Sequence, residues 1–255
     1  MEQSIEEEKK IYKYPTKSPI STSLFTTQKA ALEFSLEKGN QPPSAVFAFE
    51  IDENGRRQFL FSTIEDFWRM YRRQDVKNFY EVIGLQSRAK LYLDLEFNKT
   101  LNPDKDGYLM LKSLIRILRK KLSDDHGVKI AEKDYLCLEA SDAQKFSVHV
   151  VFDRVIFTSN IEAGRFVHEA MKGLSPQESD LFQVQGSTKS SKVIKSFCDM
   201  RVYNRNQNFR LFLASKYNQN RPLVLSRFEA PPQGEKVLDE NGEDASEWKR
   251  MDGVS

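Results

Sequence analysis

Two carboxylates stand two residues apart in the segment KLYLDLEFNK, residues 90–99, and their types and spacing suit metal-dependent chemistry. Asp94 and Glu96 alternate with apolar residues, as in a β-strand, so both side chains face the same side of a sheet. Two like charges side by side are costly to bury unless a cation lies between them. Carboxylate oxygens are hard ligands that suit a divalent cation, and with a third acid they are typical of two-metal nucleotidyl-transfer sites. The alternative is a strand whose polar face is simply acidic.

A second strand pattern, KFSVHVVF at residues 145–152, places Lys145, Ser147 and His149 on one face, opposite an apolar row. The three side chains are hydrogen-bond donors for phosphate oxygens. A lone strand histidine is also often a satisfied surface or core residue, and that interpretation stays open for His149.

A third acid, Asp199, lies in the segment SFCDMRVY and is the obvious further metal ligand. Between Gly186 and Arg221 it is the one acid among eight basic residues, a balance typical of a polyanion-binding surface. Arg210 and Lys216 in this block could neutralise a triphosphate. A merely solvated basic face is the alternative.

The composition indicates an intracellular, soluble protein. The 255 residues include 39% hydrophobic and 30% charged residues, and no apolar run approaches the roughly 20 residues of a membrane span. Cys137 and Cys198 are the only cysteines, too few for a disulfide framework or a zinc finger. We expect a monomer that does not bind membranes.

The elements that would position these residues follow from periodicity and turn signals. We expect helices at 24–38, 64–73, 108–123 and 161–172. A hairpin is expected at 45–63 around Asn54-Gly55, and further strands at 77–84, 90–97, 135–141, 145–152 and 222–226. Segments 193–203 and 208–215 are predicted to form a strand pair, and 174–196 a mobile loop.

The fold class predicted from this order is α/β (α+β) with a mixed or antiparallel sheet. An N-terminal α/β module at 21–88 precedes an RRM-like catalytic module at 89–228, in which a β-α-β-β order surrounds the carboxylate strand. Residues 1–20 are expected to be flexible or helical, and 229–255 to form an acidic flexible tail.

Taken in order, the motifs DLEF, FSVH, CDMRVYNRNQNFR and SK strongly resemble the archaeo-eukaryotic primase superfamily and, within it, the eukaryotic primase-polymerases (PrimPol). The family pattern is a DxE motif, an SxH motif and a single Asp, followed by an RNxNFR-like segment and a Lys. The resemblance runs from about Leu24 to Leu225 and includes the segments TIEDFW and FYEVIG.

The resemblance implies the primase fold and a role for each motif residue. Metal ligands for Mn²⁺ or Mg²⁺ would be Asp94, Glu96 and Asp199. The incoming dNTP or NTP would be held through its triphosphate by Lys145, Ser147, His149, Arg210 and Lys216. Arg57 resembles a basic residue near the template and nucleotide, and Tyr80 a tyrosine near the sugar. The implied activity is DNA-templated addition of nucleotides to a primer 3′ end, in repriming and damage tolerance at replication forks, in nucleus and mitochondrion.

Three features depart from the family. Gln207 replaces an arginine of the RNxNFR-like segment, the loop between the second and third motifs is short, and no Cys or His follows Arg227. The zinc module that supports primer synthesis in the family is therefore missing, so we expect no zinc and better extension than priming. A single-stranded-DNA-binding protein is a further implied partner, through C-terminal regions that this sequence lacks.

Two other functions remain open from the residues alone. The basic block and its aromatic residues also fit an RRM-like nucleic-acid-binding module without catalysis. The same carboxylates would also serve a metal-dependent nuclease. The three acids argue against the first alternative, because a pure nucleic-acid binder gains nothing from acids that face a polyanion.

Overall fold

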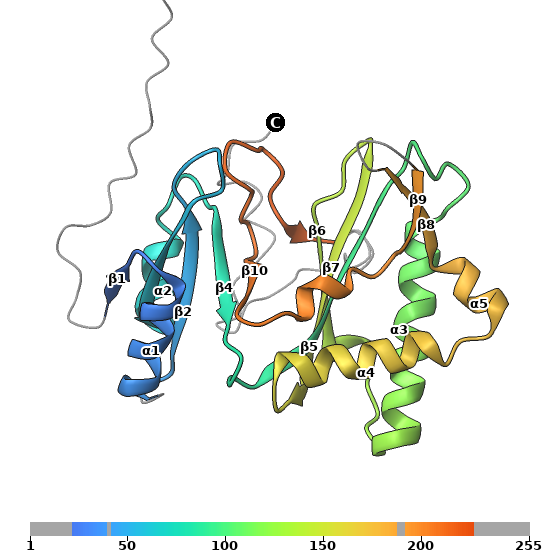
Figure 1. Cartoon of the computed structure of the whole chain (residues 1–255), viewed down its shortest axis with the longest axis horizontal. Coiled ribbons are helices and arrows are strands. Elements are labelled where there is room, and N and C mark those ends of the chain that lie inside the picture. Colours follow the sequence, from blue (N-terminus) through green and yellow to red (C-terminus); the bar gives the residue numbers. More distant parts are fainter. Residues whose placement is uncertain (1–21, 40–41, 188–191, 227–255) are drawn as a thin grey trace, which may run out of the picture. The chain divides into compact units, whose positions relative to one another are not determined.

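The computed structural model describes residues 22–39, 42–187 and 192–226 (Figure 1). The chain divides into two compact units, Met1–Val76 and Lys77–Ser255. The predictions for residues 1–20 and 229–255 lie outside the described residues. None of the helices in the described ranges has the length and hydrophobicity of a membrane span.

The first unit is a small antiparallel sheet with two helices. Its elements are β1 (Ser23–Phe25), α1 (Gln28–Lys38), β2 (Ser44–Glu50), β3 (Arg57–Thr63) and α2 (Ile64–Tyr71). β3 pairs with both β1 and β2, so the hairpin predicted at 45–63 is confirmed. The first helix starts at Gln28 rather than at residue 24, because Ser23–Phe25 pair with β3 and the Thr27 side chain caps the helix.

The second unit contains the motif residues Asp94, Glu96, Ser147, His149 and Asp199. Its elements in chain order are β4 (Phe79–Ile83), β5 (Ala89–Asn98), α3 (Gly107–His126), the 3-10 turn η1 (Glu132–Asp134), β6 (Tyr135–Glu139), β7 (Lys145–Phe157), α4 (Asn160–Lys172), α5 (Pro176–Leu181), β8 (Gln183–Ser187), β9 (Lys192–Ser196), the 3-10 turn η2 (Met200–Tyr203), β10 (Gln207–Arg210) and β11 (Val224–Leu225). The order β5-α3-β6-β7 is the predicted β-α-β-β order.

Antiparallel pairing links the strands of the second unit. A four-stranded sheet has the order β11-β6-β7-β5, β4 pairs with β10, and β8 pairs with β9. Helices combined with antiparallel sheets confirm the α+β class. The predicted module boundary at residue 88 lies after β4, whereas the compact units divide before it, because β4 pairs with β10 of the second unit.

Two local predictions in the C-terminal half are wrong. Segment 174–196 is not a loop: it holds α5, started by a capping box between Ser175 and Glu178, and the β8–β9 ribbon, with Phe182 and Val184 in the core. Segments 193–203 and 208–215 do not pair with each other, since β9 pairs with β8 and β10 with β4.

The core of the second unit lies against one face of the four-stranded sheet. Alternate residues of β5 and β7, among them Leu93, Leu95, Val148 and Val150, are fully buried in one core with residues of α3 and α4. Each such side chain contributes roughly 1.5–3 kcal/mol by leaving water. The alternation turns the intervening residues of both strands to the other face, where the motif residues stand.

A buried hydrogen-bond network ties β5 to the chain segment that follows Asp199. The Tyr92 hydroxyl lies 2.6 Å from both Oδ1 of Asn160 and the carbonyl oxygen of Val202. The Tyr203 hydroxyl donates to the carbonyl of Tyr92, and Nδ2 of Asn160 donates to the carbonyl of Asn204 at 2.8 Å. The start of α4, the strand β5 and the turn η2 are therefore held together through polar groups.

We expect Gly164→Ala to destabilise this arrangement. Gly164 lies on α4 directly against Tyr203, and an added Cβ would approach the Tyr203 Cβ to 2.5 Å. Overpacking of this kind costs about 1–3 kcal/mol, so chemical denaturation should show a loss of that size. Glu169→Ala, on the exposed side of the same helix, is the control and should change stability little. A Gly164→Ala protein as stable as the wild type would contradict the close packing.

Candidate active site

The register of β5 against β7 brings the first two sequence motifs together. Asp94 is paired with His149, Glu96 with Ser147, and Asn98 with Lys145. Directly opposed residues of antiparallel strands share a face, so both carboxylates and the Lys-Ser-His row point the same way. Nε2 of His149 lies 3.7 Å from Oδ1 of Asp94.

The third motif joins the same sheet through backbone hydrogen bonds. Leu95 forms a bridge with Cys198, the Glu96 amide donates to the Phe197 carbonyl at 3.1 Å, and the Asp199 amide donates to the Asp94 carbonyl at 2.8 Å. Asp199 then caps η2 by accepting a hydrogen bond from the Arg201 amide. Backbone hydrogen bonds therefore join residues that are about a hundred positions apart in the sequence.

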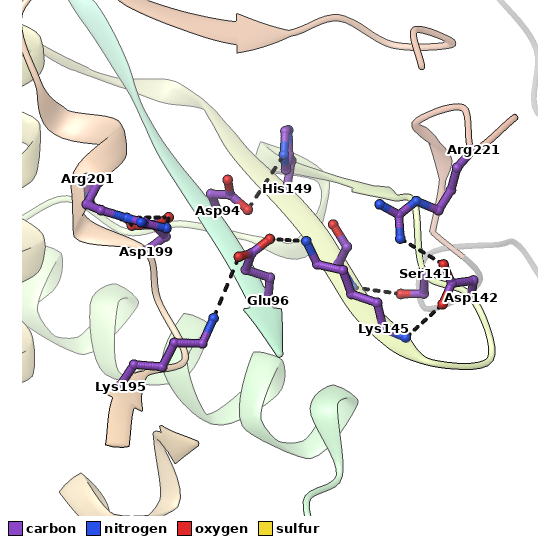
Figure 2. Close-up of polar contacts among 11 residues, drawn as sticks. Asp94, Glu96, Ser141, Asp142, Lys145, His149, Lys195, Asp199, Arg201 and Arg221 are labelled. Atoms are coloured by element: carbon purple, nitrogen blue, oxygen red, sulfur yellow. Dashed lines mark hydrogen bonds and ion pairs between the residues drawn. The ribbon is translucent and has the colours of Figure 1, made fainter. Parts of the chain in front are cut away.

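Each carboxylate is paired with a cationic or polar side chain (Figure 2). Glu96 accepts a short hydrogen bond from Lys145 and lies 3.7 Å from the ammonium of Lys195. Asp199 accepts hydrogen bonds from the Arg201 guanidinium with both oxygens, the shortest distance being 2.6 Å. Asp94 faces His149.

In this conformation the three carboxylates do not converge on one point. Within residues 22–39, 42–187 and 192–226, no group of three or more His, Cys, Asp or Glu side chains is placed to hold a metal ion. The physical reason is that Lys145, Lys195 and Arg201 draw Glu96 and Asp199 toward themselves. The predicted role of Asp94, Glu96 and Asp199 as metal ligands stays a prediction.

The three acids are nevertheless close enough for the charges of Glu96 and Asp199 to affect the pKa of Asp94. Burial, followed by the charges of Glu96 and Asp199, raises the pKa of Asp94 to about 6. Burial opposes ionisation of Glu96 too, but the hydrogen bond and charge of Lys145 lower its pKa below the usual value. Asp94 is therefore the acid whose charge is least compensated.

His149 is a neutral imidazole held in a fixed orientation. Burial, with the charges of Arg210, Lys145 and Lys216, lowers its pKa to about 3. Its ring stacks on Phe209 of β10 at 4.4 Å between centroids. Nδ1 is buried and has no hydrogen-bond partner among the described residues, which leaves its hydrogen-bonding capacity unused.

Two further predicted phosphate-binding residues lie near this row. Arg210 is buried on β10 opposite Tyr80 of β4, and its charge acts on both His149 and Asp94. Burial and the charges of Lys145, Arg210 and Arg221 lower the pKa of Lys216. The charges of Lys145 on β7, Arg210 on β10 and Lys216 in the loop after β10 therefore all act on His149.

Arg57, a further predicted site residue, is described within its own unit. It belongs to the first unit, on β3, and donates to Oε1 of the buried Glu50 at 3.1 Å. Its predicted role near the template and nucleotide stays a prediction.

Sequence reasoning missed the residues that hold the acids. Lys195 and Arg201 pair with Glu96 and Asp199, and Asn160 anchors the network behind them. The one available signal is the spacing of Asp199 and Arg201, which fits an aspartate capping a short helical turn. Lys195 is marked in the sequence only as one of the eight basic residues between Gly186 and Arg221, and no pattern singles out Asn160.

Comparison with known proteins agrees with the three motifs. No protein-family model matches the chain. The DNA-directed primase/polymerase protein of Homo sapiens is 30% identical over 291 residues, which cover 89% of this chain and 52% of the human protein. Its counterpart in Danio rerio is 29% identical, covering 80% and 45%, and that of Bos taurus 36% identical, covering 62% and 29%.

The chain belongs to the DNA-directed primase/polymerase family. It spans about half the length of the human and zebrafish members. The human and zebrafish matches cover most of this chain, so the likeness is not confined to the motifs.

The raised pKa of Asp94 predicts how stability depends on pH. Between its usual value of 3.8 and the folded value of about 6, the folded chain binds more protons than the unfolded chain. The free energy of unfolding should therefore fall as pH rises through this window. Asp94→Asn removes the titration, so above pH 6 the variant should gain up to about 3 kcal/mol over the wild type, at about 1.4 kcal/mol per unit.

Denaturant titrations between pH 4 and pH 7 without divalent metal would measure this, with Asp104→Asn at an exposed position as the control. Parallel pH profiles of the Asp94→Asn variant and the wild type would contradict the electrostatic account.

Proposed function

We propose that this chain is a primase-polymerase catalytic core that adds nucleotides to a primer 3′ end as directed by a DNA template. The observation that supports it most is the register of β5 and β7, which sets Asp94 and Glu96 against His149 and Ser147. An acidic pair and a row of phosphate-binding donors then share one face, next to the backbone-linked Asp199.

The donor set fits hard divalent cations. Asp94, Glu96 and Asp199 supply only carboxylate oxygens, the ligands that Mg²⁺ and Mn²⁺ prefer. The uncompensated charge of Asp94 is repulsion that a cation would relieve. When bound, such ions stabilise the charges of the attacking 3′-oxygen and of the leaving pyrophosphate.

The chain's own residues would bind and orient the nucleotide. His149 and Ser147 would donate hydrogen bonds to the triphosphate, while Lys145, Arg210 and Lys216 would balance its charge. The neutral, stacked His149 is rigid, so little conformational entropy is lost on binding. Tyr80, cross-strand from Arg210, would lie near the sugar. Arg57 would lie near the template and nucleotide.

By analogy with its relatives, the proposal extends to template and primer DNA as partners, with a role in repriming past damaged DNA. Nuclear and mitochondrial localisation and a link to single-stranded-DNA-binding protein belong to the same proposal. The direct test is primer extension on a DNA template with Mn²⁺ or Mg²⁺, comparing dNTPs with NTPs. Template binding without extension under either metal would favour a nucleic-acid-binding module instead.

We expect Asp94→Ala to abolish extension while binding of primed DNA persists or strengthens. Loss of one carboxylate removes a metal ligand, and it also removes a negative charge from a surface that faces phosphates. Gel-based extension and fluorescence anisotropy on the same preparations would measure the two effects. Asp104→Ala at an exposed position is the control. Extension by Asp94→Ala near the wild-type rate would exclude the assignment.

A different outcome is expected for His149→Ala. Loss of one charge-assisted hydrogen bond, about 1.5–3 kcal/mol, should raise the KM for the nucleotide roughly tenfold to a hundredfold. Steady-state extension kinetics would show this. The control is His168→Ala, an exposed histidine of α4. An unchanged KM would mean that His149 does not bind the nucleotide.

A further inference from the structure

A cavity of about 360 Å³ lies beside the two lysines that pair with Glu96. It is formed where the end of β5, the turn before β7 and the β8–β9 ribbon meet the segment around Arg221, all within the second unit. Its size falls at the lower end of the range for small-ligand sites. None of the three sequence motifs predicts it, although Lys145 belongs to its lining.

The lining of the cavity is cationic. Lys145, Lys195 and Arg221 contribute three positive charges, and Asp142 is the one acid among the lining residues. Asp142 is already engaged: it accepts hydrogen bonds from the amides of Gln144 and Lys145 and lies 2.8 Å from Nη1 of Arg221. Its role is therefore to hold the turn and orient the guanidinium. The lining residues together carry a net charge of two positive units, and Glu96, outside the lining, pairs with both lysines.

Neutral donors complete the lining. The side-chain amides of Asn98, Gln144 and Gln185 face the same cavity. In the described part of the chain, the side chains of Gln144 and Gln185 have no hydrogen-bond partner, whereas the backbone of Gln185 is fixed by Asn102. Ammonium, guanidinium and amide groups around one space are a set that recognises phosphate oxygens.

We propose that this cavity is a phosphate-binding site, adjacent to the nucleotide-binding row of Ser147 and His149 and distinct from it. Arg221 and Lys195 are its anchoring cations, and Lys145 is shared with the nucleotide-binding row. The positive charge continues toward Lys216, whose pKa is lowered by burial and by neighbouring cations that include Lys145 and Arg221. The phosphate group would belong either to free pyrophosphate or to the backbone of a nucleic-acid strand.

Placing a positive or a negative charge at the neutral Gln185 tests the site without changing any residue of the salt bridges. Gln185→Lys should tighten binding of the phosphate probe about threefold, and Gln185→Glu should weaken it about threefold, as expected for one partly exposed charge. Gln183 lies on the same face of the same strand but does not line the cavity, so the same changes there are the matched control. Opposite shifts at one position cannot result from loss of folding.

Two probes distinguish the sources of the phosphate. Labelled inorganic pyrophosphate is measured by equilibrium dialysis, and an unprimed DNA oligonucleotide by anisotropy, both with the full chain and without divalent metal or nucleotide. If the charge at residue 185 changes the affinity for pyrophosphate alone, the site binds the free anion. If it changes the affinity for the oligonucleotide, the site binds the backbone of a strand. Arg221→Gln should weaken the responding probe about tenfold.

Binding of both probes that is insensitive to charge at residue 185 and to Arg221→Gln would overturn the proposal. Because these measurements require no catalysis, they are independent of primer extension. A chain that extends primers but fails here retains the proposed function and loses only this site.

Discussion

Antiparallel pairing of β5 with β7 is the constraint on which the candidate site depends. The side-chain period of a strand is two, so a slip of one residue would send Asp94 and Glu96 into the core and expose Leu93 and Leu95. The register is fixed because the alternate residues of both strands are fully buried against α3 and α4. Burial of the apolar face therefore fixes the register, and the register fixes which polar residues stand opposite each other on the other face.

Placing three acids on that face costs free energy through charge repulsion, and the three carboxylates are not equally compensated by nearby cations. Glu96 and Asp199 have cations close by, and their pKa values are lowered, whereas Asp94 has a neutral histidine opposite it and a raised pKa. If all three were equally well compensated, the fold would be more stable but would attract a divalent cation less. Strained electrostatics of this kind are commonly found at functional sites. In this conformation two lysines pair with Glu96 and an arginine pairs with Asp199.

The sequence predicted the parts of the fold that periodicity controls and missed those that depend on long-range contacts. The hairpin of β2 and β3, the helix α3 and the alternation of β5 and β7 all follow from apolar spacing, and so did the common face of Asp94, Glu96, Ser147 and His149. The β8–β9 ribbon was missed because its Ser- and Gln-rich composition resembles a loop, and only Phe182 and Val184 reveal its buried side. Asp199 was placed in the wrong kind of element, since its neighbour Cys198 bridges to Leu95 rather than pairing with 208–215. The pairing of Lys195 with Glu96 depends on side-chain conformation, which no sequence pattern encodes.

Lys145 connects the candidate active site with the cavity next to it. Its ammonium pairs with Glu96, lines the cavity and stands in the row predicted to bind a triphosphate. Because this ammonium is directed at Glu96, it can reach a phosphate group only by weakening that pair. Any cation that takes over Glu96 therefore frees Lys145 for an anion, and any anion that draws Lys145 away leaves Glu96 more exposed to a cation. If a cation binds at Glu96 and an anion at Lys145, thermodynamic linkage requires that each favour binding of the other by the same free energy.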